Sequence, residues 1–123
     1  MRVGVLAAVM AAGLLVVAGC AHAVPFNPWL TTIDVQQAGS EAANDVGLEL
    51  YWGYECQVDG DPHDQTRFTV DCATTTGGGQ ETTLEGEGQA DSGRHYHGTF
   101  TILVDRKPVA TLHCLGNFEA PRC

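Results

Sequence analysis

Thirteen residues in the middle of the chain alternate between two kinds of side chain, and this alternation constrains the fold most. Every second position from Val46 to Val58 is apolar, aromatic or a cysteine, and the positions between are mostly polar or glycine. Successive side chains of a strand point to opposite faces, so the pattern predicts a β-strand with one buried face. We expect it to be the longest strand of one sheet, with Trp52 and Tyr54 buried and a bend or bulge at Gly53.

Four further segments alternate in the same way, separated by turn-forming residues. The predicted strands cover 65–72, 80–88, 95–105 and 109–115. The second of these carries only Leu84 as a large apolar residue, and Gly86 and Gly88 predict an edge strand or a bulge there. The chain is therefore expected to be mainly β, with about five strands in a small antiparallel sheet or partly open barrel.

The segment before the strands is compatible with one short helix over 32–45, with Thr32 as its N-cap. Gly39 and Ser40 interrupt the pattern, so a broken helix that restarts at Ser40 is the alternative. The expected organisation is a signal peptide at 1–19, a lipid anchor and tether at 20–31, and a single β-rich domain at 32–123.

The last two strands carry enough pattern to predict their register. A three-residue loop at 105–107 places three pairs on the buried side: Ile102 with Ala110, Phe100 with Leu112, and Gly98 with Cys114. A two-residue loop that pairs Val104 with Val109 mixes the two faces. The pattern therefore favours the three-residue loop.

The N-terminus is typical of an export signal. An apolar, uncharged segment follows Met1-Arg2, and it is short for a membrane-spanning helix. Val17-Ala18-Gly19-Cys20 resembles the bacterial lipobox, in which the cysteine is acylated and becomes the first mature residue. The resemblance implies lipidation of Cys20; ordinary cleavage after Ala23, giving a plain secreted protein, is the alternative. The scarcity of lysine and the abundance of alanine and glycine resemble proteins of GC-rich bacteria, so we expect an actinobacterial or mycobacterial source.

Four cysteines follow the anchor, and four in a short exported domain usually form two disulfides. The candidates are Cys56, Cys72, Cys114 and Cys123. Three pairings are possible, and we predict the sequential one. A simple hairpin turning at Asp61-Pro62 would place Cys56 opposite a residue near Arg67, so this pairing requires the chain between 57 and 65 to be irregular.

The charge of the chain limits its partners. The net charge is −9, with 15 acidic residues against six basic ones, and such a surface repels phosphates. We therefore expect no nucleic acid, and the expected partners are a membrane, through the lipid anchor, and an unknown protein or small ligand.

The residues that carry chemistry are few. His95 and His97 share a face of a predicted strand with His113 diagonally across, so the three form a weak candidate for a Zn or Cu site. The alternative interpretation is that the three histidines lie on a threonine-rich surface and have no special role. Ser40 and Ser92 are the only serines of the mature chain, and neither lies in a nucleophile motif, so a small hydrolase is the weakest hypothesis. We predict a non-catalytic cell-envelope lipoprotein without a cofactor, and an extracytoplasmic metal-binding protein is the alternative.

Overall fold

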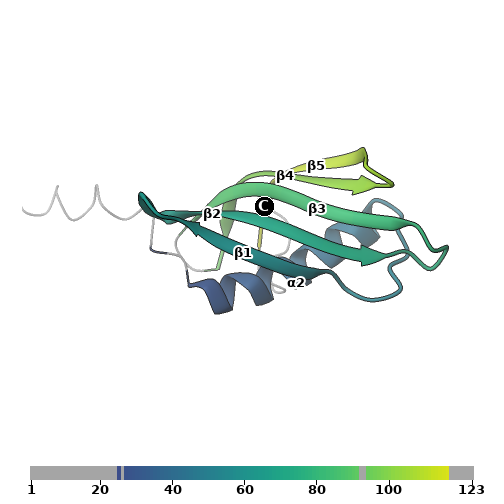
Figure 1. The fold of residues 1–123 in the computed structure, drawn as a ribbon, viewed down its shortest axis with the longest axis horizontal. Coiled ribbons are helices and arrows are strands. Elements are labelled where there is room, and N and C mark those ends of the chain that lie inside the picture. The colour runs from purple at the N-terminus through teal and green to yellow at the C-terminus, as the bar shows by residue number, and fades with distance from the viewer. Residues whose placement is uncertain (1–24, 26, 92–93, 117–123) are drawn as a thin grey trace, which may run out of the picture.

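The computed structural model describes residues 25, 27–91 and 94–116, which form one helix followed by five strands. The elements are α2 (Pro28–Asp45), β1 (Glu55–Asp61), β2 (Asp64–Thr75), β3 (Glu81–Ala90), β4 (Tyr96–Val104) and β5 (Lys107–Leu115). The strands form one open antiparallel sheet in sequence order, and the helix lies along one face of it (Figure 1). The predicted mainly β class is confirmed.

The helix begins earlier than the sequence pattern predicted. Asn27 is the N-cap, and its side-chain oxygen accepts hydrogen bonds from the backbone N–H groups of Trp29 and Leu30 at 3.1 and 3.2 Å. Pro28 suits the first helical position because no hydrogen-bond donor is needed there. The prediction of Thr32 as the N-cap is wrong, and the four residues before it, expected in the tether, are helical.

The helix also runs unbroken through Gly39 and Ser40, where an interruption was predicted. A Cβ on Gly39 would lie 2.6 Å from a methyl group of Leu84 in β3, so the glycine lets the helix approach the sheet closely. The Ser40 hydroxyl donates a hydrogen bond to the backbone oxygen of Gln36 at 2.6 Å. A helical glycine costs about 1 kcal/mol relative to alanine, and close packing against the sheet offsets that cost.

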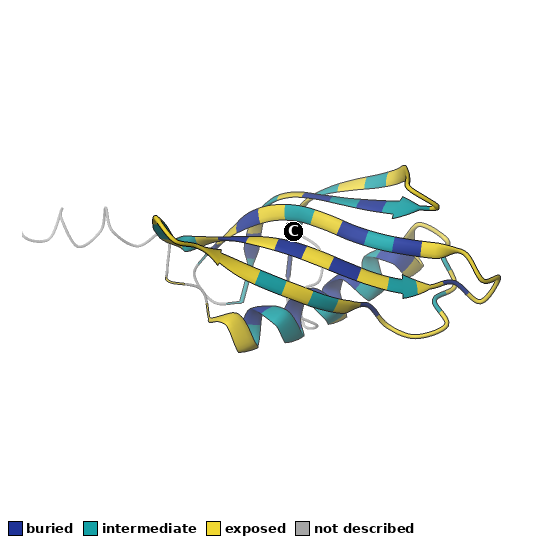
Figure 2. Cartoon of the chain, in the orientation of Figure 1, coloured by how far each residue is buried: buried dark blue, intermediate teal, exposed yellow. Residues whose placement is uncertain are grey.

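The core lies between α2 and the inner face of the sheet. Buried and exposed positions alternate along β2 and β3 (Figure 2). The largest fully buried strand residues include Phe68, Leu84, Phe100 and Ile102. Burial of each such side chain contributes about 1.5–3 kcal/mol, so these alternating positions hold the sheet against the helix.

The stretch Val46–Val58 does not form one strand, which corrects the prediction made from its alternation. Val46 is the C-cap of α2, and Leu50 makes a single bridge, to Thr76. Regular pairing of the first strand begins at Glu55. The longest strand of the described sheet is β2, with 12 residues.

β1 and β2 are neighbours whose register shifts near their turn. Between Gly60 and Asp61 the pairing slips by three residues on the β2 side. This bulge brings Cys56 directly opposite Cys72, whereas a simple hairpin placed Cys56 near Arg67. The irregularity that sequential disulfide pairing required is therefore present.

β3 is the central strand of the sheet and pairs regularly with both neighbours, so the prediction of an edge strand or a bulge is wrong. Its glycines allow close approach of neighbouring groups. A Cβ on Gly88 would lie 2.7 Å from the Phe100 ring, 3.1 Å from the Phe68 ring and 2.8 Å from the backbone oxygen of His97. Glycine stands here because two aromatic rings of the core occupy the space of a side chain.

The β4–β5 register agrees with the prediction at the centre of the hairpin and departs from it at both ends. Ile102 lies opposite Ala110 and Phe100 opposite Leu112, as predicted. The loop, however, has two residues, and a bulge beside it restores the parity that the predicted three-residue loop was to supply. A second bulge leaves His97, not Gly98, opposite Cys114.

Candidate functional site

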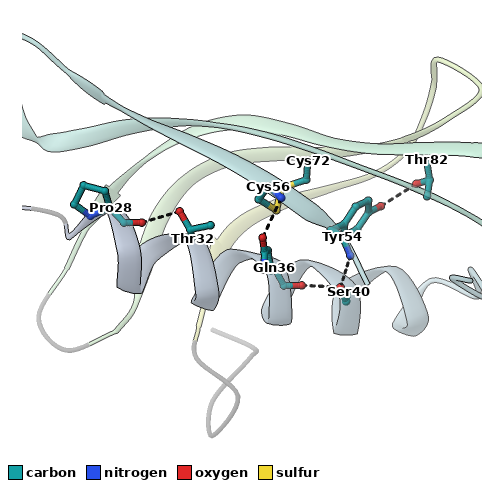
Figure 3. Close-up of a disulfide and its surroundings, with 8 residues drawn as sticks. All are labelled: Pro28, Thr32, Gln36, Ser40, Tyr54, Cys56, Cys72 and Thr82. Carbon is teal, nitrogen blue, oxygen red and sulfur yellow. Dashed lines mark hydrogen bonds between the residues drawn. A yellow bond between two sulfur atoms is a disulfide. The ribbon is translucent and has the colours of Figure 1, made fainter. Parts of the chain in front are cut away.

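The start of β1 is braced from two sides. Cys56 and Cys72 form the predicted disulfide, with an S–S distance of 2.06 Å. From the helix, Gln36 accepts a hydrogen bond from the backbone N–H of Cys56 at 3.2 Å, and the Ser40 hydroxyl accepts one from the N–H of Tyr54 at 3.0 Å (Figure 3). The chain that enters β1 is therefore fixed to both the sheet and the helix.

Of the two cysteines predicted to form the other disulfide, only Cys114 lies in the described residues. Cys114 is disulfide-bonded. Cys123, its predicted partner, lies outside the described residues, as do Cys20 and the rest of the predicted lipobox at 17–20.

Immediately before this brace the chain bulges out of the sheet edge. Leu50 lies opposite Thr76 and Glu55 opposite Ala73, so the four residues 51–54 face only two residues of β2. The predicted irregularity at Gly53 is thus present. It displaces more of the chain than one residue, because it separates Leu50 from β1 altogether.

Hydrogen bonds hold the backbone of this bulge. The N–H of Tyr51 donates to the Thr75 oxygen at 2.8 Å, and the Thr74 hydroxyl donates to the Trp52 oxygen at 3.0 Å. One step earlier, the N–H of Gly77 donates to the Glu49 oxygen at 2.7 Å. The bulge is therefore a preorganised segment and not a loose loop.

The bulge turns two large aromatic side chains into solvent. Trp52 is 71% exposed and Tyr51 is 67% exposed, while Tyr54 is only 2% exposed. The prediction that Trp52 is buried beside Tyr54 is therefore wrong, because the extra residues break the alternation between them. The two exposed rings touch edge to face, with centroids 5.2 Å apart and planes at 86°. We call this feature the aromatic bulge.

An open hollow of about 530 Å³ is lined by residues of β1 that follow the aromatic bulge in the chain and by their neighbours. Its lining comes from α2, β1 and β2: Gln36, Glu55, Cys56, Gln57, Asp71, Cys72 and Ala73. Ala73 immediately precedes Thr74, whose hydroxyl binds Trp52. Both cysteines of the disulfide are among the lining residues, and the ionisable ones, Glu55 and Asp71, have their side chains exposed on the outer face of the sheet. We call it the disulfide hollow.

A second polar cluster, which sequence reasoning missed, lies in the core. The carboxylate of Asp34, fully buried on α2, accepts hydrogen bonds from Nε of Arg94 at 2.9 Å, from a second nitrogen of that guanidinium, and from the Tyr96 hydroxyl at 2.6 Å. Burial, together with the hydrogen bond to Asp34, raises the pKa of Tyr96 to about 12. The hydrogen bonds among these three side chains link the helix to β4 and the turn before it, which indicates a structural role.

The three histidines of the predicted metal site do not come together as ligands. In the described part of the chain, no group of three or more His, Cys, Asp or Glu side chains is placed to hold a metal ion. His97 lies on the outer face with its Nδ1 2.6 Å from Oδ2 of Asp91. His95 is half-buried, and His113 is exposed on the edge strand β5. The structure therefore does not assemble the predicted three-histidine site.

Comparison with protein-family models, with curated proteins and with solved structures finds no match for this chain. Among the residues that the structure describes, no helix is both long enough and apolar enough to cross a membrane.

Proposed function

We propose that the chain is a non-catalytic exported lipoprotein of the cell envelope. In this proposal Cys20 carries the lipid that holds the protein on the outer face of the membrane, and the β-rich domain binds a partner protein or a small ligand. The apolar segment before Cys20 supports export. The bonded cysteines support it too, because disulfides persist in oxidising compartments.

The observation that carries the binding function is the aromatic bulge. A strand with unbroken alternation would have buried Trp52, and the bulge instead exposes it together with Tyr51. Bulges often re-aim side chains beside functional sites. Tryptophan and tyrosine are enriched among the residues that dominate binding energy at interfaces.

The arrangement of the helix also fits an anchored binding module. α2 begins eight residues after Cys20, and its 18 residues carry the chain roughly 27 Å along the sheet. The segment that contains the aromatic bulge follows the far end of that helix (Figure 1). The aromatic bulge therefore follows the end of α2 opposite to the end that Cys20 precedes in the chain.

The anchor is tested by the intact mass of the mature protein extracted from membranes of the producing cell, before and after reduction. We expect a diacylglyceryl mass on an N-terminal Cys20, and we expect the Cys20→Ser variant to leave the membrane fraction. A mature N-terminus at Val24 would instead establish the plain secreted protein and refute the anchor.

The binding function is tested by a photo-crosslinking residue placed at Trp52 in the full-length protein in its own cell. The matched control carries the same residue at Thr69, which is exposed on the outer face of β2. We expect a discrete crosslinked species from position 52 and none from position 69. Equal crosslinking from both positions, or none from position 52, would contradict binding through the aromatic bulge.

A further inference from the structure

The peptide bond between Asp61 and Pro62 lies where β1 turns into β2. We propose that the chain cleaves this bond itself, by attack of the Asp61 side chain on its own backbone carbonyl, and that the protein becomes two chains joined by the Cys56–Cys72 disulfide. The cleavage happens once in each molecule and needs no second protein. It therefore adds a self-processing activity to the proposed binding function and does not make the domain an enzyme with turnover.

The turn leaves this bond open to reaction. β1 ends at Asp61 and β2 begins at Asp64, so Pro62 and His63 form the whole turn. Residues 61–63 are all exposed (Figure 2). Of the five prolines in the sequence, only Pro62 follows an aspartate. Because the amide nitrogen of a proline carries no hydrogen, release of this nitrogen takes no hydrogen-bond donor away from the sheet.

The Asp61 carboxylate is held on the side of the chain where it must react. The backbone N–H of His63 donates a hydrogen bond to Oδ1 of Asp61 at 2.7 Å, which closes an Asx turn around Pro62. This hydrogen bond directs the carboxylate forward along the chain, towards the carbonyl that joins Asp61 to Pro62. Attack of the side chain on this carbonyl closes a five-membered ring, and well-oriented intramolecular reactions reach effective concentrations of about 10⁵ M or more.

The nitrogen of Pro62 needs a proton when it leaves, and the two residues that follow it differ as proton donors. Hydrogen bonds from the hydroxyl and the backbone N–H of Thr66 lower the pKa of Asp64, so this carboxylate stays ionised and is a poor acid. His63 follows Pro62 directly. Imidazole is the side chain that gains and loses a proton near physiological pH. His63 is therefore the proton donor of the reaction.

The reaction has two steps. In the first, a carboxylate oxygen of Asp61 bonds to its own backbone carbonyl carbon, the bond from that carbon to the Pro62 nitrogen breaks, and the nitrogen takes a proton from the His63 imidazolium. The products are a cyclic anhydride at Asp61 and a new chain that begins with the secondary amine of Pro62. In the second step, water opens the anhydride to two carboxylates, and the two protons released go to the imidazole and to the amine.

The structure holds the two products together. Residues 55–60 of β1 pair with residues 68–73 of β2 in six successive pairs, all of them beyond the turn. The disulfide joins Cys56, before the cleaved bond, to Cys72, after it. The cleaved protein therefore keeps β1 in the sheet, and its two chains separate only after reduction.

Mass spectrometry of the mature protein, purified from the producing cell and incubated at about pH 6, tests the cleavage, because histidine side chains titrate in this range. Without reduction, we expect the mass to rise by one water molecule. After reduction, we expect one chain that ends at Asp61 and one that begins at Pro62. Incubation with hydroxylamine is expected to leave a hydroxamate on Asp61, because an anhydride acylates this amine and a bond cut by a protease leaves nothing to trap.

Three variants locate the chemistry. Asp61→Glu keeps the carboxylate but requires a six-membered ring from a longer side chain, so cleavage is expected to slow at least about tenfold. His63→Ala keeps the backbone N–H and removes the imidazole, and it is expected to slow cleavage about a hundredfold. Asp59→Glu is the matched control, because it makes the same change at an exposed position two residues earlier on β1. Its rate is expected to stay within twofold of the unmodified protein.

A single chain after incubation and reduction would overturn the proposal. Cleavage that Asp61→Glu leaves unchanged, or that yields no hydroxamate, would overturn it too, since a protease or direct attack by water would then cut the bond. Circular dichroism of each variant confirms that it is folded. The unmodified protein unfolded in urea gives the last comparison: we expect cleavage at least about tenfold slower, and an equal rate would show that the turn has no part in the reaction.

Discussion

Asp34 and Arg94 form an ion pair that joins the middle of α2 to the turn before β4, across sixty residues of sequence. The two partners differ in their contact with water. The Asp34 side chain is fully buried, whereas the Arg94 side chain is 35% exposed. Loss of Arg94 therefore leaves a charged group away from water, whereas loss of Asp34 leaves a charged group that water can reach.

This asymmetry predicts unequal effects of substitution at the two positions. Arg94→Ala leaves a buried carboxylate without its counter-ion and is expected to lower the free energy of unfolding by about 3–5 kcal/mol. Asp34→Ala leaves a guanidinium that water can reach and a Tyr96 hydroxyl without this acceptor, so a loss of about 2 kcal/mol is expected. Urea denaturation at pH 7 measures both values. Equal losses, or a larger loss for Asp34→Ala, would show that burial of the carboxylate is not what makes the pair matter.

The phenol of Tyr96 predicts a loss of stability at alkaline pH. Burial, with the neighbouring Asp34 carboxylate, raises the pKa of Tyr96 from 10.0 to about 12. The folded protein thus holds the phenol proton more tightly than the unfolded chain does. This contribution is complete below about pH 10 and is lost as the pH rises from about 10 to 12.

Denaturation curves recorded across that alkaline window test the prediction. Tyr96→Phe is expected to flatten the fall in unfolding free energy between about pH 10 and 12, at a cost of about 1 kcal/mol near neutral pH for the lost hydrogen bond. Some slope remains, because burial also raises the pKa of Tyr54. Tyr51→Phe, at an exposed position, is the control and is expected to follow the unmodified protein.

Some of the fold could be predicted from the sequence, and the limits have physical causes. The alternation of Phe68, Val70 and Cys72 identified a strand correctly, because that face is buried and the register around it is regular. In Val46–Val58 the same kind of pattern gave a wrong prediction. A bulge in the middle of this stretch reverses the direction in which the side chains point, and the alternation in the sequence does not show it. Alternation shows which residues are apolar, but it does not show where a bulge interrupts the regular backbone of a strand.

The candidate site was harder to predict than the fold. The alternation predicts that Trp52 and Tyr54 share one buried face. The bulge, which is held by hydrogen bonds from β2 and from α2, turns Trp52 to solvent and Tyr54 to the core. The Asp34 cluster was missed because its partner Arg94 is distant in sequence. The sequence does contain one signal for this cluster: Asp34 lies on the same face of the helix as Val35 and Ala38. An acidic residue on a buried helix face needs a counter-ion beside it.

At Gly88 we predict that even the methyl side chain of alanine destabilises the fold. A Cβ there would meet the Phe100 ring and the backbone oxygen of His97 at 2.7 and 2.8 Å, and neither group can move without disturbing the core. Gly88→Ala is expected to lower the unfolding free energy by about 1–3 kcal/mol. Gly77→Ala is the matched control, because the nearest atom to its Cβ is 3.8 Å away, and a change within about 0.5 kcal/mol is expected. Thermal denaturation of the two variants separates a crowding effect from a general intolerance of losing glycine.

In the β4–β5 turn we predict that a double substitution stabilises the protein and leaves the rest of the molecule unchanged. Asp105 and Arg106 both have left-handed backbone angles, with φ of 48° and 68°, and two-residue hairpin loops of this kind favour Asn-Gly. Asp105→Asn/Arg106→Gly relieves the steric crowding of the arginine Cβ and is expected to raise the unfolding free energy by about 1 kcal/mol. Asp105→Ala/Arg106→Ala, which keeps a Cβ at both positions and loses the aspartate, is expected to lower it. If the Asn-Gly variant is less stable than the unmodified protein, the side chains of Asp105 and Arg106 must contribute more than the backbone strain that they impose.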